Sequence, residues 1–162
     1  MGSLLSGVYN PLVPIRPHHT SFRDFLTDES RSQKWFVDPR AGHHIMVLGC
    51  FRTMNRDLSF NICHLETSYV PNRGISDLEH RLTQFVPPRL SYAACSWRDH
   101  LRHTPISSDL RQELRTFSHE KLLFWFELLS LLESINNAAS SLEAAVELYA
   151  VCVVVLPPEA VF

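Results

Sequence analysis

The chain is predicted to be mainly α-helical, with a short β-hairpin near its N-terminus followed by an antiparallel helical bundle. Pro11, Pro14 and Pro17 exclude a regular helix from the start of the chain, because proline lacks an amide proton and restricts the residue before it. After residue 40, apolar residues recur at the three-, four- and seven-residue spacings of an amphipathic helix. We therefore expect an N-terminal segment at 1–40, a helical bundle at 41–156 and a disordered tail at 157–162.

The N-terminal segment is predicted to be a small hairpin packed on a short helix. Val13–Arg16 and Trp35–Val37 have the composition of extended strands and could pair with each other. Between them, Ser21 and Asp24 have the spacing of a capping box, which predicts one or two helical turns over Phe22–Leu26.

The bundle is predicted from apolar periodicity, capping signals and proline positions. Ser76 with Glu79 forms a capping box, and Pro88 suits the first turn of a helix. The expected helices cover about 44–58, 77–85, 88–101, 108–117, 121–132 and 141–149. The β-branched run Val151–Val155 fits poorly as a continuation of the last helix.

The helix expected over Lys121–Leu132 is apolar around almost its whole circumference. Such a helix must be buried or must face a partner. We therefore expect this helix to leave an apolar patch for a protein partner, and the residues predicted to contact it are Leu122, Leu123, Trp125, Phe126 and Leu129.

The composition indicates an intracellular protein and gives no case for nucleic-acid binding. A formal net charge of −2 does not supply the strongly basic face that phosphate binding needs. The chain has no signal peptide and no paired cysteine spacing, which is typical of free thiols in a cytoplasmic setting. Its longest apolar run, Ala144–Leu156, is shorter than the roughly 20 residues that span a bilayer.

Catalytic and metal-binding motifs are not evident in the sequence. Five scattered glycines cannot form a phosphate-binding loop, and no nucleophile elbow occurs. His100 and His103 could share a helical face near Cys95, so a small metal-binding enzyme is one hypothesis. Structural zinc usually needs four ligands in two close pairs, and that pattern is missing. We therefore predict no catalytic residue, no metal and no cofactor.

Several separated landmarks resemble one family of signalling proteins. The run His19–Leu26, then Arg31-Ser32 and Phe36-Val37-Asp38, is similar to the winged-helix portion of fungal NACHT proteins of the STAND class of ATPases. Downstream, Leu65–Tyr69 and Leu90–Ala93 follow the order of the helical arm beyond it. The resemblance covers about residues 12–149.

This resemblance implies a partial winged helix at 1–40 and a helical arm that transmits conformational change by packing on neighbouring domains. In a complete ATPase, His19 would be the nearest equivalent of a histidine that contacts the nucleotide phosphates. Because the chain has no Walker A loop, nucleotide hydrolysis is not expected of it. The leading hypothesis is a non-catalytic module that binds neighbouring domains or a second copy. The alternative is a truncated gene fragment with no independent function.

Overall fold

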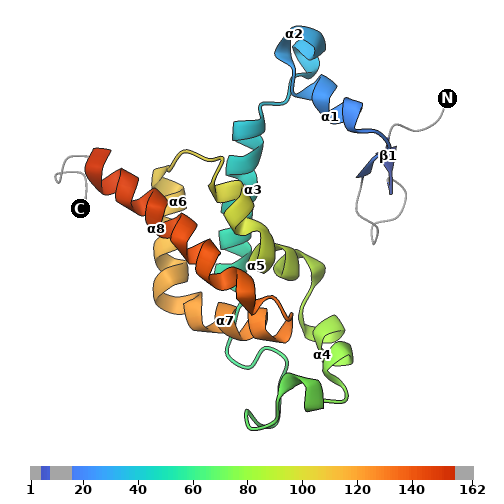
Figure 1. Cartoon of the computed structure of the whole chain (residues 1–162), viewed down its shortest axis with the longest axis vertical. Coiled ribbons are helices and arrows are strands. Elements are labelled where there is room, and N and C mark those ends of the chain that lie inside the picture. The colour runs from blue at the N-terminus through green and yellow to red at the C-terminus, as the bar shows by residue number, and fades with distance from the viewer. Residues whose placement is uncertain (1–4, 8–15, 156–162) are drawn as a thin grey trace. The chain divides into compact units, whose positions relative to one another are not determined.

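A computed structural model describes residues 5–7 and 16–155, with side chains described up to residue 148 (Figure 1). This part of the chain is mainly helical and carries a two-stranded antiparallel sheet near its N-terminus, which confirms the predicted fold class. The chain separates into two compact units, Met1–Gly42 and His43–Phe162. The tail at 157–162, for which we expected disorder, lies outside the described residues.

The first unit contains the hairpin, but its strands differ from those predicted. Strand β1 (Leu5–Ser6) pairs antiparallel with β2 (Arg16–Pro17). The expected partner strand at Trp35–Val37 is wrong, because Gln33–Trp35 is a 3₁₀ turn. There the Phe36 amide donates to the Gln33 carbonyl and the Val37 amide to the Leu26 carbonyl, so these groups do not form a strand ladder.

Two short helices follow the hairpin, α1 (Thr20–Leu26) and α2 (Glu29–Ser32). The predicted capping box at Ser21 is wrong, because the residue that caps α1 is His19. Its Nδ1 accepts a hydrogen bond from the Ser21 amide at 3.1 Å and lies 2.8 Å from the Ser21 hydroxyl. An imidazole nitrogen therefore satisfies a free amide at the helix start, and Ser21 becomes part of the first turn.

The second unit is the helical bundle, and α3 leads into it from the first unit. The helices are α3 (Pro39–Asp57), α4 (Leu78–Phe85), α5 (Pro88–Leu101), α6 (Ser108–Thr116), α7 (Leu122–Leu131) and α8 (Ala138–Val155). A π-helical segment, Phe117–Lys121, joins α6 to α7. Pro88 opens α5, as predicted from the sequence.

Three helix boundaries differ from prediction for local reasons. Helix α3 starts earlier, at Pro39, where the Asp38 carboxylate accepts a hydrogen bond from the Arg40 amide at 2.9 Å. The capping box predicted at Ser76 does not form. Instead α4 begins after Asp77, whose carboxylate pairs with Arg81 at 2.8 Å. Helix α8 continues through Val155, because adding a β-branched residue to an existing helix costs little.

An aromatic cluster fills the core of the bundle, and each helical segment around it contributes one ring. Phe51 of α3 lies 5.2 Å from Trp97 of α5 and 5.4 Å from Phe117 of the π-helical segment. Trp125 of α7 lies 5.8 Å from Trp97 and 5.7 Å from Phe117, all between ring centroids. These four side chains are at most 1% exposed. Offset and edge-on packing of this kind stabilises aromatic pairs beyond the area that they bury.

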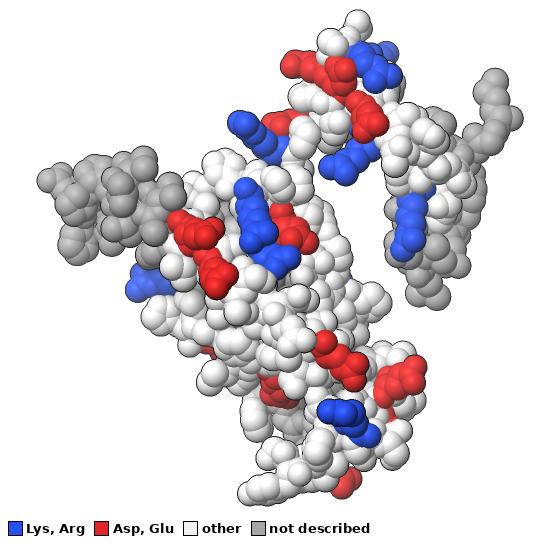
Figure 2. All heavy atoms as spheres, in the orientation of Figure 1, with Lys and Arg blue, Asp and Glu red and all other residues white. Residues whose placement is uncertain are grey.

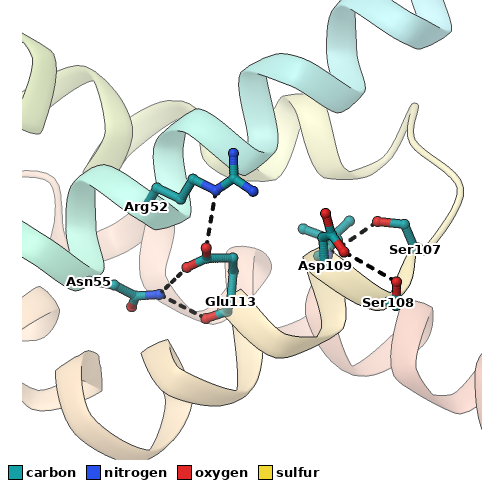
Figure 3. Close-up of polar contacts among 7 residues, drawn as sticks. Arg52, Asn55, Ser107, Ser108, Asp109 and Glu113 are labelled. Carbon is teal, nitrogen blue, oxygen red and sulfur yellow. Dashed lines mark hydrogen bonds and ion pairs between the residues drawn. The ribbon is translucent and has the colours of Figure 1, made fainter.

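A polar contact joins α3 to α6 at the edge of this core (Figure 3). The Asn55 amide donates to the Glu113 carboxylate at 2.8 Å and to the Glu113 carbonyl at 3.0 Å. Arg52, one turn earlier on α3, donates to the same carboxylate at 3.1 Å. Glu113 thus fixes the position of α6 along α3 through two side chains of one helix face.

Candidate protein-binding surface

A long loop separates α3 from α4. It runs from Leu58 to Asp77 and contains only one short 3₁₀ turn, Asn72–Gly74. Connections longer than about 12–15 residues are uncommon in compact domains, and ordered ones usually carry function. The contacts that hold this loop therefore matter for its role.

Hydrogen bonds within the loop and from α4 hold its first half in place. The Asn61 side chain accepts from the Leu65 amide at 2.7 Å and donates to the Leu65 carbonyl at 2.9 Å. Asn61 has a positive φ of 49°, a conformation that asparagine tolerates better than most residues. From α4, Arg81 donates to the carbonyls of Cys63 and His64 at 3.3 and 2.7 Å. Cys63 is fully buried beneath this turn.

Hydrogen bonds from two of its residues join the loop to the side of α7. The Asn61 backbone amide donates to the Glu127 carboxylate at 3.1 Å, and the Asn72 side chain donates to the Ser130 carbonyl at 3.0 Å. Between these two points the loop and α7 enclose a hollow of about 580 Å³. Its lining includes Phe60, Tyr69, Val70 and Leu131.

Large apolar side chains are exposed around this hollow. Tyr69 is 95% exposed, Phe60 78% and Val70 41%. Leu123 of α7 is 76% exposed and lies one helical turn before Glu127 on the same helix face. We call Phe60, Tyr69, Val70 and Leu123 the loop–α7 surface. Single exposed apolar residues are normal, but three that line one hollow, with Leu123 exposed on the helix beside it, indicate a contact site.

The five residues predicted to contact a partner differ in exposure, because they lie on different sides of α7. Trp125 and Leu129 are 0% and 1% exposed and belong to the core, so they are not available to a partner. Leu122 and Phe126 are half-buried against that core. Leu123 is exposed. The expectation of a broad uncovered patch on this helix therefore fails at Trp125 and Leu129.

The histidines of the metal hypothesis lie in a hydrogen-bonded cluster. His43 Nδ1 is 3.0 Å from His100 Nδ1, and the Tyr92 hydroxyl is 2.6 Å from His100 Nε2. The His103 ring packs on His43 with 4.8 Å between centroids, whereas Cys95 is exposed. Both nitrogens of His100 are thus engaged. Among the described residues, no three histidine, cysteine or acidic side chains are arranged to hold a metal ion.

Burial shifts the pKa values of His100 and of the Cys50 thiol. Burial lowers the pKa of His100, the neighbouring His43 and His103 lower it further, and Asp99 acts in the opposite direction. Burial raises the pKa of Cys50 to about 11, so this thiol stays protonated at neutral pH. A protonated, buried thiol is a poor nucleophile.

The surface of the described residues carries mixed charge. On the face drawn in Figure 2, Lys and Arg side chains lie among Asp and Glu rather than gathering into one basic area. None of the helices in the described part of the chain has both the length and the apolar character needed to span a membrane.

No family model matches the chain, and no curated protein or solved structure is significantly similar to it.

Proposed function

We propose that the chain is a non-catalytic helical module that binds a protein through the loop–α7 surface. The observation that carries this proposal is the exposure of Phe60 and Tyr69 on a loop that hydrogen bonds hold against α7. A loop that is already ordered loses little conformational entropy when it binds. Most of the free energy gained by burying its apolar side chains therefore adds to the affinity. Aromatic side chains are also the residues most often enriched at protein interfaces.

The resemblance to fungal STAND ATPases suggests which protein is bound. In that family, a helical arm of this kind packs on neighbouring domains of the same protein in the cytoplasm. The natural partner would then be such a domain, and in the isolated chain a second copy would occupy the same surface. In this setting His19 would approach a nucleotide only when an ATPase core is present, through Nε2, because Nδ1 caps α1.

Two observations favour a non-catalytic role. The buried Cys50 thiol has a raised pKa, which opposes its use as a nucleophile. Both ring nitrogens of His100 are within hydrogen-bond distance of neighbouring side chains, which leaves neither free to act as a general base.

The experiment is sedimentation velocity of the purified chain over about 5–100 µM, where mass action would reveal weak self-association. We expect the wild-type chain to form dimers or larger species and the Phe60→Ser/Tyr69→Ser variant to be a monomer. The control is Ile45→Ser/Ile135→Ser, which removes two exposed apolar side chains outside the surface, 69% and 42% exposed.

Two results would contradict the proposal. One is a wild-type chain that stays monomeric and binds no apolar dye. The other is an equal loss of association in both variants, since that would indicate non-specific association of exposed apolar side chains rather than binding through one surface. Circular dichroism of each variant checks that the helices are intact.

A further inference from the structure

A second hollow opens on the surface of the bundle and is lined by residues of α5, α6, α7, α8 and the π-helical segment. Its volume is about 750 Å³, within the range of small-molecule sites. Apolar side chains from five helical segments form most of its walls, among them Leu114, Phe117, Leu122, Leu142 and Val146. We call this hollow the α8 groove.

The π-helical segment Phe117–Lys121 forms one side of the α8 groove. A π turn adds a residue to a helix, and such turns occur frequently at functional sites. Here Phe117 is buried in the aromatic core, while Ser118 and His119 are exposed and line the groove. The π turn thus brings polar groups to the edge of an apolar hollow.

Arg115 is the charged side chain in the described lining of the α8 groove. Among the residues that the structure describes, the polar side chains that line it are those of Arg115, Ser118 and His119, and none is an aspartate or a glutamate. The ion pairs and hydrogen bonds of the described residues do not use the Arg115 guanidinium. An arginine without an acidic partner at the edge of an apolar groove is complementary to an anion that carries an apolar body.

The wall of the α8 groove also contains an unsatisfied donor. Trp97 lines the groove and is 1% exposed, and its buried Nε1–H has no acceptor among the described residues. Buried donors are nearly always paired, and leaving one unpaired is costly. Arginine cannot accept a hydrogen bond, so a molecule that pairs with Arg115 in this groove must bring acceptors of its own.

We infer that the α8 groove binds a long-chain carboxylate of the fatty-acid class. The alkyl chain packs on the walls formed by Phe117, Leu122 and Leu142. The carboxylate faces Arg115, whose planar guanidinium can bind both oxygens. This site is separate from the loop–α7 surface, and the two proposals can fail independently.

The experiment is a fluorescence titration of the full, delipidated chain with cis-parinaric acid, a fluorescent fatty acid, followed by displacement with laurate. We expect saturable binding of one probe per chain. Arg115→Gln should weaken binding of the acid about three- to tenfold, as expected for one partly exposed charged contact, and leave binding of the matching alcohol unchanged. Val146→Trp, at a position 67% exposed, should occupy the groove and abolish binding of both.

The matched control is Arg102→Gln, an exposed arginine of the bundle that does not line the groove. The inference is wrong if the wild-type chain shows no saturable binding, if Arg102→Gln and Arg115→Gln have equal effects, or if the alcohol binds the wild type as tightly as the acid. Displacement of the probe by an amphipathic helical peptide but not by laurate would also overturn it, because the groove would then be a docking site for a helix.

Discussion

Two buried tryptophans in one core allow the value of a single hydrogen bond to be predicted. Trp97 and Trp125 are 1% and 0% exposed, and their ring centroids are 5.8 Å apart. The Trp125 Nε1–H donates to the Ala94 carbonyl at 2.9 Å, whereas the Trp97 Nε1–H has no acceptor among the described residues. The same substitution, Trp to Phe, therefore removes a satisfied donor at one site and an unsatisfied donor at the other.

The magnitude follows from the difference between the two sites. Both substitutions leave a cavity of similar size in the same core, so this cost largely cancels in the comparison. Trp125→Phe loses a hydrogen bond that stabilises the folded chain by about 1 kcal/mol net. Trp97→Phe removes an unsatisfied donor whose desolvation destabilises the folded chain by about 1 kcal/mol or more. We predict that Trp125→Phe lowers the free energy of unfolding by about 2 kcal/mol more than Trp97→Phe does, a factor of roughly 30 in the folding equilibrium.

The assay is urea unfolding of the delipidated chain, followed by circular dichroism because both variants alter tryptophan fluorescence. Equal m-values would show that the midpoint difference reports stability alone. If Trp97→Phe were as destabilising as Trp125→Phe or more so, the Trp97 donor would be satisfied in solution.

Three further predictions concern the rest of the second unit. Because the folded pKa of His100 lies below its ordinary value of 6.5, the unfolded chain takes up the proton first as pH falls. The free energy of unfolding should thus decrease between about pH 7 and pH 5, and His100→Gln should weaken this dependence in urea titrations. Iodoacetamide should alkylate the exposed Cys95 in the native chain and reach Cys50 only after unfolding, as peptide mass mapping will show. Asn55→Ala should cost about 1 kcal/mol of stability and Arg52→Ala under about 0.5 kcal/mol, because the Arg52 contact is largely exposed.

The helical fold could be predicted from the sequence because its signals are local. Pro88 stands at the first position of α5, as predicted, and apolar periodicity located the buried faces that carry Phe51 and Trp97. One error, at the start of α4, arose where a side chain had two possible partners. Asp77 could cap α4 or pair with Arg81, and the ion pair formed instead.

The candidate surface could be predicted only in part. An apolar run marked α7 as unusual, but periodicity cannot tell which of its sides other helices cover, and they cover Trp125. Phe60 and Tyr69 were not predicted, because no regular pattern distinguishes an exposed aromatic side chain in a loop from a buried one. The signal available was the length of the gap between the helices predicted to end near Leu58 and to begin near Ser76.

The central claim, that the loop–α7 surface binds protein, is tested most directly by photo-crosslinking of the purified chain. Benzoylphenylalanine would replace Tyr69, and in a matched sample Ile45, so that only the first sample carries the crosslinker on the surface. We predict a crosslinked dimer at position 69 whose attachment sites map to the same loop and to α7 of the second copy, and little product at position 45. Equal yields at the two positions, or attachment sites scattered over the chain, would contradict the account.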